Sequence, residues 1–185
     1  TVYGGRLIAG GFFSSAGGGS ANCIAAWNGS SWASLGSGMN NTVSALTTYG
    51  TYLIAGGPFT VIGGDSLKHI AAWDGSQWSD MMGAFDGTNI LAMAVDGDEL
   101  FAGGNFSVAG GVNADNIALW NGSSWGPLGG GLNNAVNDLA FLDTLLIVGG
   151  DFTTAGGAVA NYIAAWNGSS WSTLGSGMNH AVYSL

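Results

Sequence analysis

The sequence predicts an all-β fold, a β-propeller of four blades with four strands in each blade. One observation behind this prediction is an internal repeat, because four glycine pairs follow one another at intervals of 46, 47 and 46 residues. The pairs begin at Gly10, Gly56, Gly103 and Gly149. The other is that each repeat holds four short strand signals without helical periodicity. Four strands in about 40 to 50 residues is the content of a propeller blade.

The first two strands of each repeat are short apolar runs joined by a tight turn. Turn signals such as Asp96-Gly97 lie between them. The first strand is expected at residues 43–46, 90–93, 136–139 and 182–185. The second strand ends at the glycine pair and is expected at residues 7–9, 52–55, 100–102 and 145–148. A long glycine-rich loop follows each second strand, as at residues 12–22 and 152–161.

The last two strands come from a stretch of nine residues that is repeated almost unchanged. It reads IAAWNGSSW at residues 24–32 and returns at residues 70–78, 117–125 and 163–171. An apolar run ends in Trp, an Asn-Gly or Asp-Gly dipeptide follows, and a second Trp begins the next strand. Asn-Gly and Asp-Gly readily adopt the positive φ values of a tight turn, so each copy predicts a hairpin.

The tryptophan pairs of these hairpins have two interpretations. They could stack on sugar rings, but their regular position in every repeat favours packing between blades, since a buried Trp removes about 150–250 Å² from water. We therefore expect structural roles for Trp27, Trp32, Trp73, Trp78, Trp120, Trp125, Trp166 and Trp171.

The repeats predict a single domain over residues 1–185. Its four units span about residues 1–46, 47–93, 94–139 and 140–185. The second unit is degenerate, because it has one extra residue after Trp78, where the stretch 81–86 replaces the usual LGSGM.

The two ends of the chain continue each other in register. Placing Thr1 after Leu185 leaves the same separation between strand leucines as the seven residues from Leu46 to Leu53. We therefore expect one blade to be built from both termini, which closes the ring and removes exposed sheet edges. The alternative is part of a larger propeller or repeat array.

The spacing of the glycine pair and the second Trp resembles the kelch-type propeller repeat. The match covers the whole chain, and residues 149–157 and 163–171 are also similar to kelch-like repeats of bacterial secreted and cell-surface proteins. The resemblance implies the propeller fold and implies little about activity, since kelch propellers include oxidases, adaptors and adhesins.

Composition excludes several partners. Only 7% of residues are charged, the net charge is -9, and Arg6 and Lys68 are the only strong cations. Nucleic acid and anionic membranes require several Lys or Arg residues, so neither is expected as a partner. No apolar run is long enough to span a bilayer, so no membrane insertion is expected. Cys23 is the single cysteine, which leaves no partner for a disulfide within the chain.

The sequence offers little for catalysis, and we expect no enzyme and no cofactor. His69 and His180 occupy different repeat positions, and no His/Cys cluster has ligand spacing. Glu99 is the only glutamate, which disfavours a glycosidase with paired carboxylates. Asp96, Asp98 and Glu99 could bind calcium weakly, although a solvated hairpin turn explains them better. A hydrolase or an oxidase is the least favoured function.

Binding is expected on the face that carries the long loops. In a four-stranded blade, the loops after the second and fourth strands lie on one face, and long loops on a rigid scaffold commonly bind ligands. Asparagine and other polar residues are frequent there, although each could instead cap its own loop. The candidate ligand-binding residues are Asn40, Asn41, Asn105, Asn133, Asn134, Asp151, Asn179 and His180.

The function predicted from these observations is a non-enzymatic, extracellular or cell-surface module with a structural or interaction role. Low charge and regular repeats suit a rigid building block that could assemble into surface fibres or act as an adhesin. The alternative is a lectin-like propeller that binds carbohydrate through loop asparagines and an exposed Trp. The expected partner is a protein, including a second copy of the chain, or a glycan.

Overall fold

The computed structural model describes residues 1–80, 83 and 85–185, and these residues form strands, turns and loops without a helix. The prediction of an all-β fold is confirmed. Four antiparallel sheets of four strands and three two-stranded hairpins make up the described regular structure. Residues 81, 82 and 84, in the degenerate stretch of the second repeat, lie outside the described residues.

We number the four-stranded sheets 1 to 4 along the chain. Sheet 1 contains β1 (Val2–Tyr3), β2 (Arg6–Gly10), β5 (Ile24–Trp27) and β6 (Trp32–Ser34). Sheet 2 contains β7 (Ala45–Tyr49), β8 (Tyr52–Gly56), β9 (Ile70–Trp73) and β10 (Trp78–Ser79). Sheet 3 contains β11 (Asn89–Asp96), β12 (Glu99–Asn105), β15 (Ile117–Trp120) and β16 (Trp125–Pro127). Sheet 4 contains β17 (Val136–Leu142), β18 (Leu145–Gly150), β21 (Ile163–Trp166) and β22 (Trp171–Thr173).

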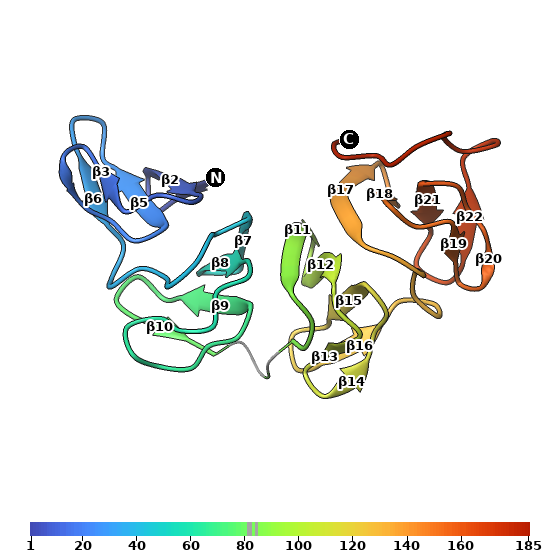
Figure 1. Ribbon diagram of the computed structural model, residues 1–185, viewed down its shortest axis with the longest axis horizontal. Helices are drawn as coiled ribbons and strands as arrows, with labels where there is room; N and C mark the ends of the chain where they lie inside the picture. Colours follow the sequence, from blue (N-terminus) through green and yellow to red (C-terminus); the bar gives the residue numbers. More distant parts are fainter. Residues whose placement is uncertain (81–82, 84) are drawn as a thin grey trace.

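The four sheets follow one another around an open arc (Figure 1). The first strands lie on the inner side of the arc, where β11 packs against both β7 and β17. Buried clusters fill the space between neighbouring sheets, and one of them joins Ile24 of sheet 1 to Leu53 and Trp73 of sheet 2. The hydrophobic core is therefore a series of similar junctions rather than one central layer.

The first glycine of each pair makes these junctions close. A Cβ atom built on Gly10 would lie 2.5 Å from Cγ1 of Val43, and one built on Gly56 would lie 2.7 Å from Cγ2 of Ile90. Real Cβ atoms do not approach a neighbour so closely. The repeated glycine thus provides the space into which the β-branched residue of the following sheet packs.

The expected closure of the ring within one chain is absent from the structure. Residues 182–185, which we expected to form a first strand, lie in no strand, and no described pairing joins them to β1 or β2. Three successive junctions carry the chain round an arc that leaves the N-terminal and C-terminal sheets apart (Figure 1). The repeat pattern in the sequence does not specify the angle between neighbouring sheets, and that angle decides whether four sheets close into a ring.

The hairpins between the third and fourth strands lie where the sequence predicts them, between the two Trp residues, but the backbone conformation of their turns differs from the expected one. Trp27 pairs with Trp32, so the connection has four residues. The positive φ value belongs to Gly29, at 100°, and not to the preceding asparagine. Oδ1 of Asn28 instead accepts hydrogen bonds from the backbone N–H groups of Ser30 and Ser31, each 2.9 Å long. The hairpin was predicted correctly, but an Asx turn forms it.

Small hairpins inside three of the long loops were not predicted. Their strands are β3 (Ser15–Ala16) with β4 (Gly19–Ser20), β13 (Val108–Ala109) with β14 (Val112–Asn113), and β19 (Thr154–Ala155) with β20 (Ala158–Val159). Two-residue strands carry no usable periodicity, which explains why the sequence did not indicate them.

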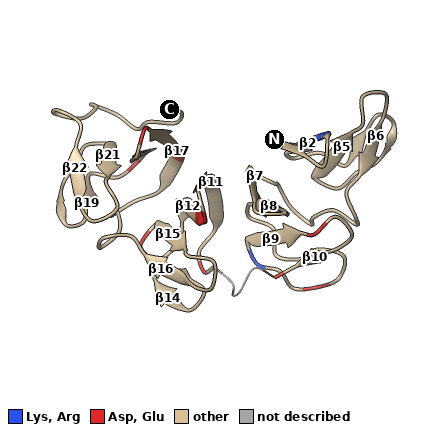
Figure 2. Cartoon of the chain, turned by 180° about the vertical axis from the view of Figure 1, so that it is seen from behind, with Lys and Arg blue, Asp and Glu red and all other residues tan. Residues whose placement is uncertain are grey.

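Charged residues are few and scattered along the chain, and the 11 acidic residues outnumber the two Lys and Arg residues (Figure 2). Arg6 lies in sheet 1 and Lys68 in the long loop of sheet 2. None of the described residues belongs to a helix long and apolar enough to cross a membrane.

Candidate functional site

The long loops and the connecting loops gather on one face of the arc. The long loops run from the second to the third strand, at residues 11–23, 57–69, 106–116 and 151–162. The connecting loops join successive sheets and extend past sheet 4, and their described parts include residues 35–44, 128–135 and 174–181. We call this the long-loop face. The opposite face carries the tight turns and the four-residue hairpins, because successive connections in an antiparallel sheet alternate between the two ends of the strands.

The connecting loop between sheets 1 and 2 and the one between sheets 3 and 4 each bridge two long loops. In the first one, the backbone N–H of Met39 donates to the carbonyl of Asn22 in sheet 1. The next residue, Asn40, bonds to the long loop of sheet 2, where its Oδ1 accepts from the N–H groups of Thr60 at 2.9 Å and Val61 at 3.1 Å. Asn133 makes the same bonds to Thr153 and Thr154 at the junction of sheets 3 and 4. These asparagines hold neighbouring sheets together.

Asp86 takes this role between sheets 2 and 3. Its Oδ1 accepts from the N–H groups of Ser107 at 2.8 Å and Val108 at 2.6 Å, and its Oδ2 accepts from Oγ of Ser107 at 2.7 Å. Burial raises the pKa of the Asp86 carboxyl, but these hydrogen bonds outweigh burial and hold the pKa below its ordinary value. The carboxylate is therefore stabilised as a structural acceptor and is poorly suited to act as a general acid or base.

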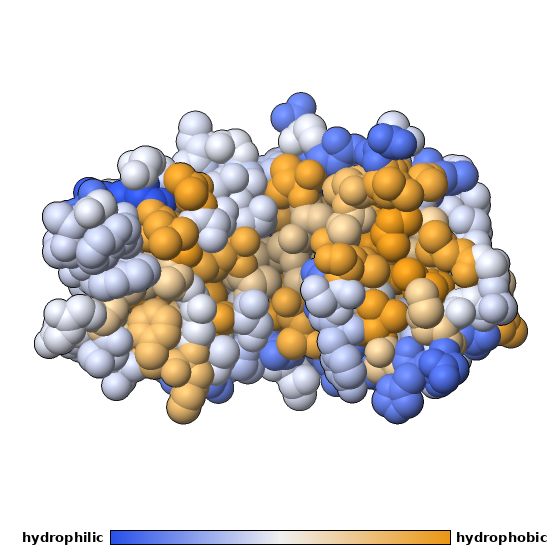
Figure 3. All heavy atoms as spheres, turned by 90° about the horizontal axis from the view of Figure 1, so that it is seen from above, coloured by the Kyte–Doolittle hydropathy of each residue, from blue (hydrophilic) through white to orange (hydrophobic). Residues whose placement is uncertain are grey.

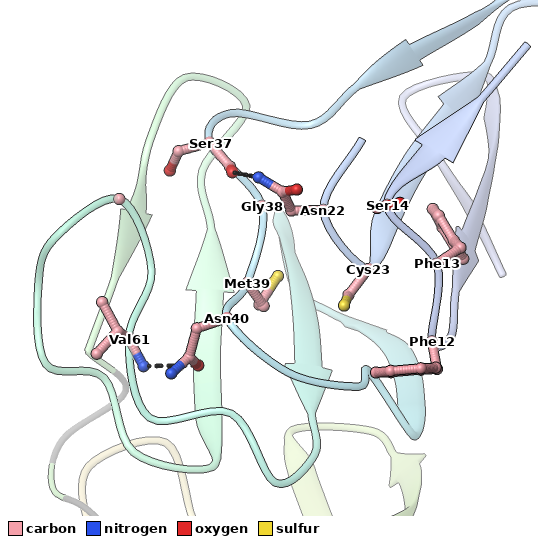
Figure 4. Close-up of a pocket in the computed structure, with 11 residues that line it drawn as sticks. Phe12, Phe13, Ser14, Asn22, Cys23, Ser37, Gly38, Met39, Asn40 and Val61 are labelled. Carbon is pink, nitrogen blue, oxygen red and sulfur yellow. Dashed lines mark hydrogen bonds between the residues drawn. The ribbon is translucent and has the colours of Figure 1, made fainter. Parts of the chain in front are cut away.

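A pocket of about 630 Å³ lies on the long-loop face between sheets 1 and 2. Phe12 and Phe13 line one side, and the sulfur atoms of Cys23 and Met39 lie near its centre (Figure 4). Phe12 is 84% exposed, which is the highest value among the exposed large hydrophobic residues described. The pocket is therefore mainly apolar, with an aromatic ring presented to solvent at its rim.

The two asparagine side chains of this pocket already have partners within the loops. Asn22 donates from Nδ2 to the carbonyl of Ser37 at 3.1 Å, and Asn40 accepts from Val61 (Figure 4). They fix the shape of the pocket. A ligand would therefore find an apolar surface beside groups whose main hydrogen bonds are internal.

A second pocket, of about 450 Å³, lies at the matching place in sheet 3, between its long loop and the connecting loop that leads to sheet 4. Asn105 stands where Phe12 stands in the first repeat, Asp115 replaces Asn22, and Asn116 replaces Cys23. The scaffold thus repeats a hollow at sheet junctions and varies its lining from apolar to polar. Such variation on a constant frame is typical of binding loops.

The candidate residues from the sequence divide into three groups. Asn40, Asn105, Asn133 and Asn134 line the two pockets. Two others serve local structure, since Asn41 accepts from the N–H of Thr42 at 2.8 Å and Asp151 accepts from Nδ2 of Asn137 at 3.4 Å.

Asn179 and His180 lie in the connecting loop after sheet 4. The side chain of Asn179 is exposed and makes no hydrogen bond in the described part of the chain. The ring of His180 stacks on Tyr162, with centroids 6.3 Å apart and planes at 12°. The structure therefore does not bring the eight candidates together into one site.

Phe12 was missed from the sequence, although a signal existed. Its counterparts in the other repeats are Pro58, Asn105 and Asp151. A position that accepts Asn and Asp is exposed in those repeats, so an aromatic residue there is exposed as well.

A strained backbone position was also missed. The residue before each third strand has a positive φ value although none is glycine: Cys23 (62°), His69 (68°), Asn116 (63°) and Tyr162 (64°). Such conformations are uncommon outside glycine and can mark functional sites. Here the same conformation recurs in all four repeats, where each N–H bonds a carbonyl of the long loop, as Cys23 does with Phe13 at 2.8 Å. The recurrence indicates a structural role.

The tryptophans lie at the sheet junctions. Trp73, Trp120, Trp125 and Trp166 are buried, and the other four are half-buried. Nε1 of Trp78 donates to the carbonyl of Leu35 at 3.2 Å, and Nε1 of Trp171 donates to the carbonyl of Leu128 at 3.1 Å, so these rings link one sheet to the preceding one.

No cluster of three or more His, Cys, Asp or Glu residues suited to a metal ion occurs among residues 1–80, 83 and 85–185. Asp96 and Glu99 face each other across the turn between β11 and β12, and the carbonyl of Asp98 accepts from Oη of Tyr49 at 2.8 Å. A hydrogen bond therefore links this turn of sheet 3 to Tyr49 in sheet 2.

The sequence matches no family model and no curated protein. Among solved structures, it is similar to the computationally designed Ika8 protein, with a TM-score of 0.62 and 14% identity over 100% of this chain. It is also similar to the computationally designed Ika4 protein, with a TM-score of 0.52 and 15% identity over 89% of this chain and 86% of that one. This chain covers 50% of the Ika8 chain.

These two neighbours are designed proteins and not kelch proteins. At such low identity the likeness concerns the fold alone. It supports an all-β architecture of repeated four-stranded antiparallel sheets. It does not support the rest of the kelch resemblance.

Proposed function

We propose that this chain is a non-enzymatic interaction module with a β-propeller architecture, and that it binds its partner on the long-loop face. The observation that carries the proposal is the pocket between sheets 1 and 2, where the side chains of Asn22 and Asn40 are bonded into the scaffold and Phe12 is exposed at the rim. Preformed apolar hollows with a few fixed polar groups are the usual form of binding sites. Such a rigid, weakly charged module suits an extracellular or cell-surface location.

A displayed library of short peptides containing aromatic residues tests binding at this site. We expect peptides selected on the wild-type chain to lose on the order of tenfold or more in affinity for the Phe12→Ala variant, because aromatic anchors dominate such contacts. Val112→Ala is the matched control, since Val112 is also exposed but lies in β14, in the long loop of sheet 3, outside this pocket. Selected peptides that bind both variants equally would contradict the assignment of the pocket.

Carbohydrate binding is a second candidate, favoured by the same exposed ring, because aromatic rings pack against the apolar faces of sugars. The tryptophans are less suitable for this role than we expected, since all eight are buried or half-buried. A glycan array decides between the candidates: binding that disappears in Phe12→Ala supports the lectin function, and an array without signal contradicts it.

A further inference from the structure

The two ends of the arc are the two halves of a junction that occurs three times inside the chain. At each internal junction, one apolar residue of the connecting loop bridges to the long loop of the following sheet, as Met39 does with Ile62 and Leu132 does with Ala155. Met39, Phe85 and Leu132 are only 3%, 1% and 2% exposed. Met178 occupies the same repeat position after sheet 4 and is 49% exposed, because no other sheet of the described residues packs against it.

The N-terminal end shows the complementary deficit. Leu7 in β2 is 48% exposed, whereas its counterparts Leu53, Leu100 and Leu146 are 0%, 0% and 1% exposed. Trp27 is half-buried, although the corresponding Trp residues in the other three sheets are buried. Sheet 1 therefore exposes the apolar surface that sheets 2 to 4 bury against the sheet before them.

Hydrogen-bonding groups are unpaired at both ends in the same complementary way. Asn179 stands at the repeat position of Asn40 and Asn133, whose Oδ1 atoms each accept two backbone N–H groups. In sheet 1 the matching donors are the N–H groups of Ser14 and Ser15, and neither has such an acceptor in the described part of the chain. An acceptor is free at one end, and its two donors are free at the other.

The backbone edges match as well. A Cβ atom built on Gly149 would lie 2.5 Å from Cγ1 of Val182, as one built on Gly10 would from Val43. The N–H of Val182 donates to the carbonyl of Gly150 at 3.2 Å, the bond that Val43 makes to Gly11 at 3.3 Å. Residues 182–185 are thus already seated against sheet 4 as the start of a following sheet.

Sheet 1 has only the last part of its first strand, and residues 182–185 have the sequence of the missing first part. The first strand of sheet 1, β1, has only two residues, and they pair with Leu7 and Arg6. In sheet 2 the first strand is longer and reaches Gly56 through Ala45. Residues 182–185 of another chain would supply that missing part to β2 in the register seen in sheet 2.

We propose that two copies of this chain join head to tail at both ends and close one ring of eight sheets. Each end of one arc meets the opposite end of the other and forms a fourth junction of the kind repeated inside the chain. The open side of the arc, seen in Figure 3, presents hydrophobic residues between polar margins. Head-to-tail contacts form a closed ring when the curvature of the subunits brings the last end back to the first. The chain has the shape of an open half-ring (Figure 1), so two copies can complete the circle.

This inference goes beyond the proposed binding on the long-loop face and stands if that binding fails. Phe12 is not part of the contact, because its counterparts Asn105 and Asp151 stay at least partly exposed in sheets that have neighbours. The two proposals therefore have separate tests.

The first test is the mass of the chain of residues 1–185 in solution, measured by sedimentation equilibrium at micromolar concentration. We expect twice the 18.5 kDa of one chain. A uniformly monomeric chain, or filaments of unlimited length, would overturn the closed pair.

A charge placed in the contact should separate the copies. Met178→Asp buries a carboxylate in the proposed junction, so we expect dimer dissociation at concentrations on the order of tenfold or more above that of the wild type. Val112→Asp is the control, because it places the same charge on an exposed hydrophobic position of β14, in the long loop of sheet 3, away from both ends. Equal dissociation constants for wild type and Met178→Asp, with circular dichroism unchanged, would overturn the proposal.

Mixed cross-linking tests the register and the route of closure. Chains carrying Asn179→Cys are mixed with chains carrying Ser14→Cys and treated with a short bis-maleimide, with the buried Cys23 replaced by Ala in both. We expect a cross-linked product of twice the mass only in the mixture. A chain that carries both cysteines and cross-links only within itself would show a ring closed by one chain and would overturn the two-copy ring.

Discussion

At the scale of single residues, side-chain acceptors replace backbone hydrogen bonds at the loops. The first residue of each four-residue hairpin is Asn28, Asp74, Asn121 or Asn167, and in every copy its Oδ1 accepts from the backbone two and three residues later. Asp and Asn are interchangeable here because both present an oxygen at the same distance from the backbone. These residues explain the repeated Asn-Gly-Ser without a ligand or a glycan.

The loss of one such acceptor should be measurable. Asn167→Ala leaves the N–H groups of Ser169 and Ser170 to solvent, so we expect a loss of about 0.5–1.5 kcal/mol in the free energy of unfolding. Asn167→Asp is the control and should stay near the wild type, as the natural Asp74 indicates. Urea unfolding followed by Trp fluorescence measures both, and an equal loss in the two variants would count against the Asx turn.

Asp86 makes one sheet junction sensitive to acid. Its folded-state pKa lies below the ordinary value of 3.8, so its contribution to stability is full above that value and falls as the pH drops through the folded-state pKa. Asp86→Asn, which copies Asn40 and Asn133, should lose less stability than the wild type between pH 7 and pH 3. Unfolding curves at the two pH values provide the comparison, and parallel losses would contradict this role.

At the scale of the strands, the glycine pair sets how closely successive sheets approach. A Cβ atom on Gly104 would collide with the backbone carbonyl of Asn89 in the first strand of the same sheet. A backbone group cannot rotate away as the end of a side chain can. The pair therefore acts through two contacts: its first glycine receives the following sheet, and its second permits the pairing within the sheet.

Gly104→Ala should consequently destabilise the fold by about 1–3 kcal/mol, as overpacked sites do. Gly126→Ala is a suitable control, because no atom lies within 4 Å of its added Cβ and its φ value is not positive. Its stability should change by no more than about 0.5 kcal/mol. Thermal unfolding of both variants tests the difference, and similar melting temperatures would refute the steric explanation.

At the scale of the whole molecule, the arc is a row of similar junctions with an unused half at each end. Repeat proteins of this kind depend on neighbouring units for stability, and an uncovered terminal unit exposes the surface that other units bury. Sheet 1 and the loop after sheet 4 have this character, as Leu7 and Met178 show. Stability should then depend on whether the ends are covered.

If two copies cover each other's ends, the stability of the chain depends on its concentration. We expect the melting temperature of the wild type to rise when the protein concentration is raised tenfold, because association favours the folded state by mass action. The melting temperature of Met178→Asp should stay nearly constant over the same range. Calorimetry at several concentrations measures this, and a wild-type value independent of concentration would contradict the linkage.

The sequence by itself determined the repeat, the four strands of each unit, the absence of helix from the described residues and the face that carries the long loops. These features are local, since turn residues and apolar runs act over a few positions and recur at a constant spacing. The sequence also indicated Asn40 and Asn133 as loop residues, but their role as links between sheets required their partners about 20 residues further along the chain.

Only the tertiary structure decided that the chain forms an open arc and that Leu7 and Met178 remain uncovered. The physical reason is that closure depends on the angle added at each sheet junction, and that angle arises from the packing of Trp, Gly and β-branched side chains in three dimensions. A sequence pattern that continues from Leu185 into Thr1 is the same for a ring closed by one chain and for a ring that needs a second copy.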